Sequence, residues 1–341
     1  MTATGHKPIR FAICGTGRMA HVMAQELNGM AADNVLLAAV VSRAKDRGAA
    51  FAGEHSIARV HVGIEALAAD GEIDAVYLAT PPAGHARELE LLIGAGKAVL
   101  CEKPFTLNGR QARDIAERAR RSRVLVVEAM WTRFLPAVRK AHDMLSGGAI
   151  GAPQFLVAGG AFMPPYDPTH YLQNRELGGG VLLDAGVYLI SMASLTLGKV
   201  RHVMASAAIG EHAVDDHDAM LIEYHSGARA LLYVSLRARR MPDAEWTGPQ
   251  GTLWLPGPIF RPTRIVLRAA GRAECILEEP CEGSGYRYQL REFVAALRAG
   301  RTESETLPLA ETLAVMDTMD AVRAAIGMHY DCDTRAPRAA P

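Results

Sequence analysis

The chain has 341 residues, 49% of them apolar and 22% charged, and this length exceeds what one hydrophobic core usually serves, so we expect two domains. Lys plus Arg equal Asp plus Glu, so the net charge is zero, which argues against a general attraction to nucleic acid or to an anionic membrane. Five cysteines without a CxxC pair indicate neither a disulfide framework nor a metal site, and they fit a reducing cytoplasm.

The first predicted element is a short apolar strand at Ile9 to Cys14, followed by a glycine turn and a helix near Met19 to Leu27. Gly15, Gly17 and Ala20 form the pattern G-x-G-x-x-A, and strand, turn and helix are the context that this motif requires. Gly15 permits the tight turn, Gly17 admits a pyrophosphate and Ala20 keeps the helix close to the strand. The helix amino terminus favours the anion, so the pattern predicts a dinucleotide site.

The end of the next predicted strand indicates which dinucleotide binds. A cofactor without the 2′-phosphate usually meets an acidic residue there, but this chain has Ser42 and Arg43, with Arg47 four residues further on. If a helix starts here, the two arginines share a face, and a guanidinium can hold a phosphate through paired hydrogen bonds. A solvated helix start is the alternative. We favour NADP, with NAD possible.

Strands and helices then alternate. Buried strands are predicted at Ala75 to Ala79, Ala98 to Cys101 and Val124 to Val127, with amphipathic helices between them. This order predicts a parallel, doubly wound sheet that binds ligands at the carboxyl ends of its strands. The residues at or just beyond such ends are Gly15, Ser42, Thr80, Lys103 and Trp131.

The periodicity changes after Trp131. Strand-like runs separated by turns, without long helices between the later ones, predict a mostly antiparallel sheet. These runs are Gln154 to Phe162, Val200 to Ile209, Ala219 to Tyr224, Ala228 to Leu236 and Thr263 to Leu267, followed by helices near Tyr286 to Ala299 and Leu309 to Ile326. We predict an α/β fold with a dinucleotide-binding domain at residues 1–130, a substrate-binding domain at 131–330, and a disordered or loosely attached tail at 331–341.

The stretch from Val181 to Leu197 approaches the length of a membrane span but contains Asp184, so we interpret it as a buried helix. Asp184 and Tyr188 stand four residues apart, on one face of such a helix. They are either a buried hydrogen-bonded pair or part of a proton-transfer site. The run His212 to Asp218 resembles a metal cluster only superficially, and we expect its charged side chains to be solvated.

Three motifs in order, G-x-G-x-x-A at Gly15, E-K-P at Glu102 and G-G-G-V-L-L-D-A-G-V-Y at Gly178, resemble the glucose–fructose oxidoreductase / inositol dehydrogenase / rhizopine-catabolism (Gfo/Idh/MocA) family over nearly the whole chain. Within it the chain is most similar to the dimeric dihydrodiol dehydrogenase branch, which also uses sugars such as D-xylose. Most of the family has histidine where this chain has Tyr188, a departure that this branch shares and that argues against a typical inositol dehydrogenase.

The resemblance implies a Rossmann domain, an open antiparallel sheet that makes oligomer contacts, and a Lys103-Pro104 bond that is often cis. It supports Lys103, Tyr188 and Asp184 as catalytic residues, because alcohol oxidation by hydride transfer also removes the hydroxyl proton. Free tyrosine has a pKa of about 10, and an ammonium such as that of Lys103 favours the phenolate. Asp184 would orient the substrate.

Further residues follow as cofactor or substrate contacts. We expect cofactor contacts from Gly15, Thr16, Gly17, Arg18, Met19, Ser42, Arg43, Arg47, Thr80, Pro81, His85, Glu102, Lys103, Trp131 and Arg133, and substrate contacts from Lys103, Trp131, His170, Asp184 and Tyr188. No metal is expected.

The expected activity is NADP-dependent hydride transfer on a secondary alcohol or carbonyl of a sugar, polyol or cyclic diol. A ketone or anhydrosugar reductase with the same site is one alternative, and a catalytically silent NADP sensor is another, although a sensor needs neither Lys103 nor Tyr188. We expect a cytoplasmic homodimer or homotetramer that acts on a small molecule, without nucleic-acid or membrane partners.

Overall fold

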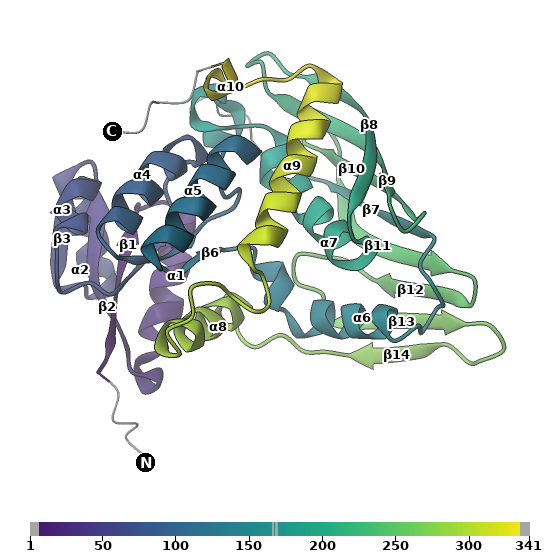
Figure 1. Cartoon of the computed structure of the whole chain (residues 1–341), viewed down its shortest axis with the longest axis horizontal. Coiled ribbons are helices and arrows are strands. Elements are labelled where there is room, and N and C mark those ends of the chain that lie inside the picture. The colour runs from purple at the N-terminus through teal and green to yellow at the C-terminus, as the bar shows by residue number, and fades with distance from the viewer. Residues whose placement is uncertain (1–6, 166, 168–169, 335–341) are drawn as a thin grey trace. The chain divides into compact units, whose positions relative to one another are not determined.

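The alternating strands and helices of the amino-terminal half form a six-stranded parallel sheet in the computed structural model, which describes residues 7–165, 167 and 170–334. Its strand order is β3-β2-β1-β4-β5-β6, which is that of a doubly wound dinucleotide-binding sheet. Figure 1 labels β1, β2, β3 and β6 of this sheet. The prediction of a Rossmann-type α/β fold is therefore confirmed. The strands are β1 (Ile9–Cys14), β2 (Val35–Ser42), β3 (Arg59–Val62), β4 (Ala75–Leu78), β5 (Ala98–Cys101) and β6 (Val126–Glu128).

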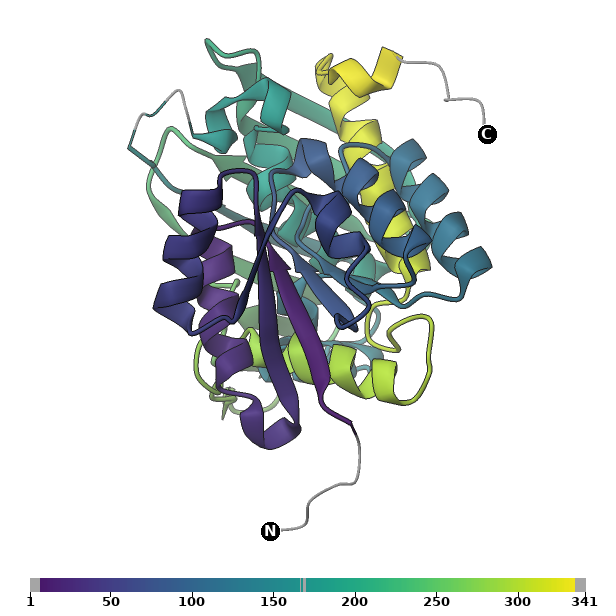
Figure 2. The ribbon, with the colours of Figure 1, turned by 90° about the vertical axis from the view of Figure 1, so that its left-hand side faces the viewer.

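Helices cover both faces of this sheet. Figure 2 shows α1 and α2 side by side on one face, and α4 and α5 on the other. The central strands are buried on both faces, and this explains why their sequences are continuous apolar runs. The helices of this part are α1 (Arg18–Asn28), α2 (Lys45–His55), α3 (Ile64–Ala68), α4 (Pro82–Gly94), α5 (Gly109–Ser122) and α8 (Arg287–Arg298), with a 3₁₀ turn, η1, at Ala31–Asp33.

The chain divides into two compact units, and both are discontinuous. Unit 1 comprises the chain up to Phe105, Gln111–Ala129 and Tyr286–Leu309, and unit 2 comprises Thr106–Arg110, Met130–Gly285 and the chain from Ala310. The sequence alone placed the segment of α8 in the second domain. It belongs to unit 1, where the Phe293 ring lies 5.8 Å from that of Phe11 and Nε of Arg287 lies 2.9 Å from a carboxylate oxygen of Glu26.

Unit 2 is built on an eight-stranded sheet of order β14-β13-β12-β11-β7-β10-β9-β8. Only β7 and β10 pair in parallel, so the prediction of a mostly antiparallel sheet is confirmed. The strands are β7 (Phe155–Ala161), β8 (Val200–Ile209), β9 (Asp215–Tyr224), β10 (Arg229–Ser235), β11 (Arg240–Gly248), β12 (Gly251–Leu255), β13 (Arg264–Ala269) and β14 (Cys275–Glu278).

Three of these strands, β11, β12 and β14, were not predicted, and β9 begins four residues earlier than expected. Strand β11 contains Pro242 and several charged residues, a composition that disfavours a strand. It forms because it pairs with β7 on one side and β12 on the other, which is tertiary information that the local sequence lacks.

One face of the unit 2 sheet is buried and the other is exposed. Along β7 and β10, Leu156 and Leu232 are buried, whereas Val157 and Leu231 between them are 48% and 44% exposed. The buried face packs against α7 (Val187–Leu197), and α6 (Pro136–Ser146) contacts β12 and β13. The sheet therefore presents a row of apolar side chains to solvent.

The carboxyl-terminal part of unit 2 contains α9 (Leu309–Ile326) and α10 (Asp331–Thr334). The expectation of a loose tail from residue 331 is wrong for its first residues, because Asp333 pairs with Arg323 at 2.6 Å and accepts a hydrogen bond from Asn108 at 2.7 Å. Residues 335–341 lie outside the described residues.

The apolar stretch expected to form a buried helix does so. Within the described residues, Arg175–Leu197 is the one helical stretch that is long and apolar enough to cross a membrane by length and composition, and 72% of its most apolar window is buried inside the fold. Such burial is typical of a core helix.

Candidate active site

The glycine turn after β1 in unit 1 has the geometry that its glycines predict. Gly15 has φ +108°, and a Cβ there would lie 2.5 Å from the carbonyl oxygen of Ala79, so the fold itself requires glycine. Gly17 caps α1, and apart from atoms of Gly17 and its two neighbours in the chain, no described atom lies within 4 Å of a Cβ built on it. Packing therefore does not demand glycine at residue 17, whereas close approach of a pyrophosphate to the backbone would.

The basic residues after β2 lie at the same edge of the sheet. The hydroxyl of Ser42 accepts a hydrogen bond of 3.2 Å from the backbone N–H of Ala44 and so turns the chain into α2. Arg43 lies just before the helix and Arg47 lies in its first turn, and both are exposed. The expectation that one helical face carries both arginines is therefore only partly met.

Helix α4 holds the segment after β4 in place. The hydroxyl of Thr80 donates to Glu88 on α4, and Pro81 caps that helix. His85 is fully buried, with Nε2 2.9 Å from the carbonyl oxygen of Thr80 and Nδ1 3.0 Å from that of Pro104.

His85 therefore joins the loop after β4 to the loop after β5, at the carboxyl ends of these strands. Burial lowers the pKa of the His85 imidazole, and its hydrogen bonds to backbone groups oppose this shift. Because His85 has no exposed surface, its geometry supports a role in positioning the loops after β4 and β5.

Lys103 follows β5, and hydrogen bonds hold the backbone on both sides of it. The buried carboxylate of Glu102 accepts hydrogen bonds from the hydroxyl of Tyr77 and, at 3.2 Å, from the backbone N–H of Lys103. The Lys103-Pro104 peptide is cis, as the resemblance implied, and the next N–H, of Phe105, donates to Glu128 at 3.1 Å. The lysine side chain is half-buried at the carboxyl end of its strand.

Tyr286 was not predicted as a site residue. It precedes α8, its hydroxyl lies 3.9 Å from the sulfur of Met19, and burial raises the pKa of its phenol, with Glu102 adding to this and Arg18 and Lys103 opposing it. It therefore lies beside the phosphate turn and the lysine. Its position in sequence, far beyond the strands of unit 1, gave no signal.

In unit 2 the predicted helix around Asp184 begins with a wider turn. Residues Leu182–Gly186 form a π-helical turn before α7, where a regular α-helix was expected, so the angular relation between Asp184 and Tyr188 differs from that of an α-helix. Single π turns are frequent at functional sites. The hydroxyl of Tyr171 donates to Asp184 Oδ1 at 2.6 Å.

Tyr188 is half-buried on the first turn of α7. Nε1 of Trp131 lies 3.1 Å from its hydroxyl oxygen, and its ring lies 5.0 Å from that of Phe260. Because the indole N–H only donates, the tyrosine oxygen accepts this bond. Such a bond suits a phenolate as well as a phenol.

Two expected contact residues have other roles in the fold. Arg133 is buried, with Nε 2.8 Å from the hydroxyl of Ser191 and a second nitrogen 3.2 Å from Glu311, so it joins α7 to α9. His170 is exposed and caps the 3₁₀ turn Tyr171–Gln173 by accepting from Leu172 N–H at 3.3 Å.

The acidic run at the start of β9 was expected to be solvated, and this is wrong for two of its residues. Asp215 and Asp218 are fully buried. Asp215 accepts the N–H of Leu182 at 2.6 Å, which fixes the start of the π turn. Burial raises the pKa of both carboxyls, and the charge of Asp215 helps to raise that of Asp218 to about 9.

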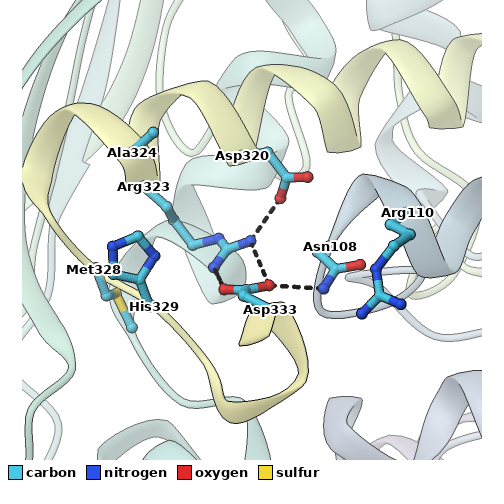
Figure 3. A pocket seen from close by; sticks show the side chains of 8 residues that line it. All are labelled: Asn108, Arg110, Asp320, Arg323, Ala324, Met328, His329 and Asp333. Carbon is cyan, nitrogen blue, oxygen red and sulfur yellow. Dashed lines mark hydrogen bonds and ion pairs between the residues drawn. The ribbon is translucent and has the colours of Figure 1, made fainter. Parts of the chain in front are cut away.

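A polar hollow of about 260 Å³ in unit 2 (Figure 3) is separate from these residues. Arg323 lies at its centre and bonds to Asp320 and Asp333, and Asp333 also accepts from Asn108 at 2.7 Å. Burial would raise the pKa of Asp333, but the bonds from Arg323 and its other donors lower it. The charges offset one another, and the bond between Arg323 and Asp333 attaches α10 to α9.

Two family profiles match the chain. The oxidoreductase family with an NAD-binding Rossmann fold matches residues 9–130, and the Gfo/Idh/MocA carboxyl-terminal domain matches residues 138–254. The chain belongs to the Gfo/Idh/MocA oxidoreductase family. Its unit 1 is the family's NAD(P)-binding Rossmann fold, and the resemblance seen in its motifs is confirmed.

Similar proteins include several dehydrogenases and a reductase. The trans-1,2-dihydrobenzene-1,2-diol dehydrogenase of Danio rerio is 29% identical, covering 96% of this chain and 99% of that protein, and the Oryctolagus cuniculus enzyme of the same name is 30% identical, covering 86% and 92%. The crystal structure of KijD10, a 3-ketoreductase from Actinomadura kijaniata in complex with NADP and TDP-benzene, is 26% identical and covers 94% of this chain and 98% of that chain with a TM-score of 0.84.

Proposed function

We propose that this Gfo/Idh/MocA oxidoreductase uses NADP to transfer a hydride between the nicotinamide and a secondary alcohol or carbonyl of a sugar, polyol or cyclic diol. The observation that carries the proposal is the position of Lys103, at the carboxyl end of β5 on the same sheet edge as the Gly15 turn. A dinucleotide that binds at this edge would bring its nicotinamide within reach of an ammonium.

The proton is assigned to Tyr188. In oxidation its oxygen takes the hydroxyl proton of the substrate, and in reduction it returns that proton. Lys103 favours the phenolate and binds the substrate oxygen, and the Trp131 N–H fixes the direction of the tyrosine hydroxyl. Asp184, which accepts from Tyr171, accepts a second substrate hydroxyl, since a carboxylate has several acceptor sites. The cofactor supplies the hydride chemistry.

The substrate class rests on the relatives. Diol dehydrogenases and a 3-ketoreductase act on secondary alcohols or the corresponding ketones, and the same residues serve both directions. Incubation of the purified protein with NADP⁺ or NADPH and a panel of sugars, polyols, diols and ketosugars tests the proposal through the absorbance of the reduced nicotinamide. A catalytically silent sensor would bind the cofactor and leave this absorbance unchanged with every compound.

Arg43→Ala should weaken NADP binding and leave NAD binding nearly unchanged. Arg43 lies exposed beyond the end of β2, and we assign its guanidinium to the 2′-phosphate. Loss of such a charge-assisted contact costs about 1.5–3 kcal/mol, or roughly 10- to 150-fold in the dissociation constant. Fluorescence titration with both cofactors measures the difference.

Arg121→Ala is the matched control, because Arg121 is an exposed arginine of unit 1 on α5, paired with Glu117. It should change neither titration. An equal loss of NADP and NAD affinity in Arg43→Ala would show that this arginine does not read the 2′-phosphate.

We also propose that the exposed face of the unit 2 sheet joins copies of this chain. Phe155, Val157 and Leu231 are neighbouring apolar residues on this face, each 43–48% exposed, and such contiguous apolar surface is typical of an interface. The protein should sediment as a dimer or tetramer. Leu231→Asp should shift it toward monomer, because a carboxylate at the centre of an apolar interface would be desolvated.

Leu36→Asp is the control for this change. Leu36 is 51% exposed on β2, in unit 1, so the same substitution there should leave the oligomer intact. A wild-type protein that sediments as a monomer at micromolar concentration would refute the proposed interface.

We propose a cytoplasmic location and a small-molecule substrate as the main partner. All five cysteines of the chain lie within the described residues and are free thiols, which supports a reducing compartment.

A further inference from the structure

Three potential metal ligands from helices α1 and α2 lie close together in unit 1. His21 lies in the first turn of α1, and Glu54 and His55 end α2. Nδ1 of His21 lies 2.8 Å from Nε2 of His55, and Glu54 Oε1 lies 3.3 Å from the first nitrogen and 3.6 Å from the second. The sequence analysis did not predict this group, because His21 and Glu54 lie 33 positions apart in the chain.

We propose that His21, Glu54 and His55 bind one divalent cation of the zinc class, which joins α1 to α2. Two imidazole nitrogens and one carboxylate oxygen are the kind of ligand set that Zn²⁺ takes, with solvent in the fourth position. The set is mixed nitrogen and oxygen, so Mg²⁺ and Ca²⁺, which prefer oxygen ligands alone, are disfavoured.

The distances between the ligand atoms support this assignment. Around a tetrahedral zinc ion with bonds of about 2.0–2.1 Å, ligand atoms lie about 3.3–3.4 Å apart. The two separations from Glu54, 3.3 and 3.6 Å, already agree with this geometry. Only the 2.8 Å between the histidine nitrogens must lengthen, by about 0.5 Å, which small rotations of the two rings provide.

The surroundings hold the histidines and leave one side open. The ring of Phe51 packs against both, with centroids 4.7 Å from His21 and 4.6 Å from His55. The His55 side chain is buried, those of His21 and Glu54 are 37% and 59% exposed, and Asn28 donates to the His55 carbonyl at 3.0 Å. An ion can therefore reach the site from solvent on the side of His21 and Glu54, while Phe51 holds the two histidine rings in place.

Binding would stabilise the dinucleotide-binding unit. Helix α1 begins at the phosphate turn and α2 begins after Arg43, so a metal link between them ties together the two elements that follow the expected diphosphate and 2′-phosphate sites. A ligand that binds only the folded state raises its stability.

Isothermal titration of the untagged protein with Zn²⁺ tests the proposal, with Mg²⁺ as the second titrant and thermal melting as the second readout. We expect one zinc per chain, a higher Tm with zinc than with a chelator, and no response to Mg²⁺. Glu54→Gln keeps the shape of an exposed side chain and should lower zinc affinity at least tenfold. His55→Gln should abolish binding, whereas His202→Gln, at an exposed histidine of unit 2, should have no effect.

The alternative is a histidine pair that merely shares a hydrogen bond. Absence of saturable zinc binding by the wild-type protein would establish that alternative and overturn the proposal. Zinc binding of unchanged affinity in both Glu54→Gln and His55→Gln would overturn it as well, because the ion would then lie elsewhere.

Discussion

Lys103→Met should cut turnover by several orders of magnitude while the protein still folds and binds NADP. Methionine keeps the length and apolar stem of the side chain and removes only the ammonium. The backbone of residue 103, held by Glu102, does not depend on the side chain. The ammonium is assigned to the substrate oxygen and to the stabilisation of a phenolate, so its loss raises the barrier of the chemical step. Steady-state kinetics and a cofactor titration separate these effects.

Lys97→Met is the matched control at the opposite end of β5. Lys97 is buried, and its ammonium donates to the carbonyl oxygens of Asp70 and Ile73 at 2.5 and 2.8 Å. Its replacement should lower the Tm, because two carbonyls lose their charged donor, and should leave the turnover of the folded protein near normal. Lys103→Met should therefore lower turnover without unfolding the protein, and Lys97→Met should lower the Tm without lowering turnover.

Tyr188→Phe should lose turnover to a similar extent. Phenylalanine preserves the packing against Phe260 and removes the oxygen that carries the proton. The double variant with Lys103→Met should be little worse than either single variant, because groups that act as a unit are not additive. Near-normal turnover of Lys103→Met on a good substrate would refute the mechanism, and additive losses would show that the two side chains act separately.

Asp218→Asn should make the protein more stable, with a gain that grows as the pH rises. Asp218 is buried beside Asp215, and burial, followed by the charge of Asp215, raises its pKa to about 9. In the unfolded chain an aspartate ionises at a pKa of about 3.9. Between these two values the folded protein keeps a proton that the unfolded chain has lost.

The direction in which stability changes with pH follows from this difference in pKa between the folded and the unfolded chain. The raised pKa of the folded state means that stability is greatest below about pH 3.9 and falls as the pH rises, by about 1.4 kcal/mol per unit, until the carboxyl ionises near its folded value of about 9. At pH 7 the cost amounts to as much as roughly 4 kcal/mol. Asparagine imitates the protonated acid without titrating, so it removes the cost and flattens the pH dependence.

Denaturant unfolding from neutral to mildly alkaline pH measures this effect. Asp243→Asn, at a half-exposed aspartate of β11 that pairs with Arg240, should change stability little at any pH. Turnover of Asp218→Asn should persist, because Asp215 still accepts the Leu182 N–H at the π turn. An Asn variant that is less stable than wild type, with an unchanged pH slope, would show that the ionised carboxylate is needed in the fold.

The sequence predicts unit 1 well because its signals are local. Buried parallel strands read as continuous apolar runs, and the Gly15 turn carries its conformational requirement in one residue. Lys103 could be placed at the end of a strand for the same reason, since two charges and a proline stop an apolar run.

The features that the sequence did not predict depend on contacts between distant segments. Asp215 and Asp218 look solvated in a run of charged residues, yet both are buried. Gly180 and Leu182, more than 30 positions away in the sequence, pack against Asp215. The π turn at Leu182–Gly186 was not predicted, because nothing in the spacing of its residues distinguishes it from the start of a regular α-helix. Tyr286 reaches the Rossmann edge only because α8 returns to unit 1.

The central claim is that this protein transfers a hydride directly between a substrate carbon and NADP. The most direct measurement takes a sugar or diol that is turned over, labels the carbinol carbon with deuterium, and follows the label into the reduced nicotinamide by mass spectrometry. We predict one deuterium in each NADPH formed, and loss of this transfer in Lys103→Met. Reduced nicotinamide without deuterium, or cofactor binding without turnover of any sugar, polyol, diol or ketosugar in either direction, would contradict the claim.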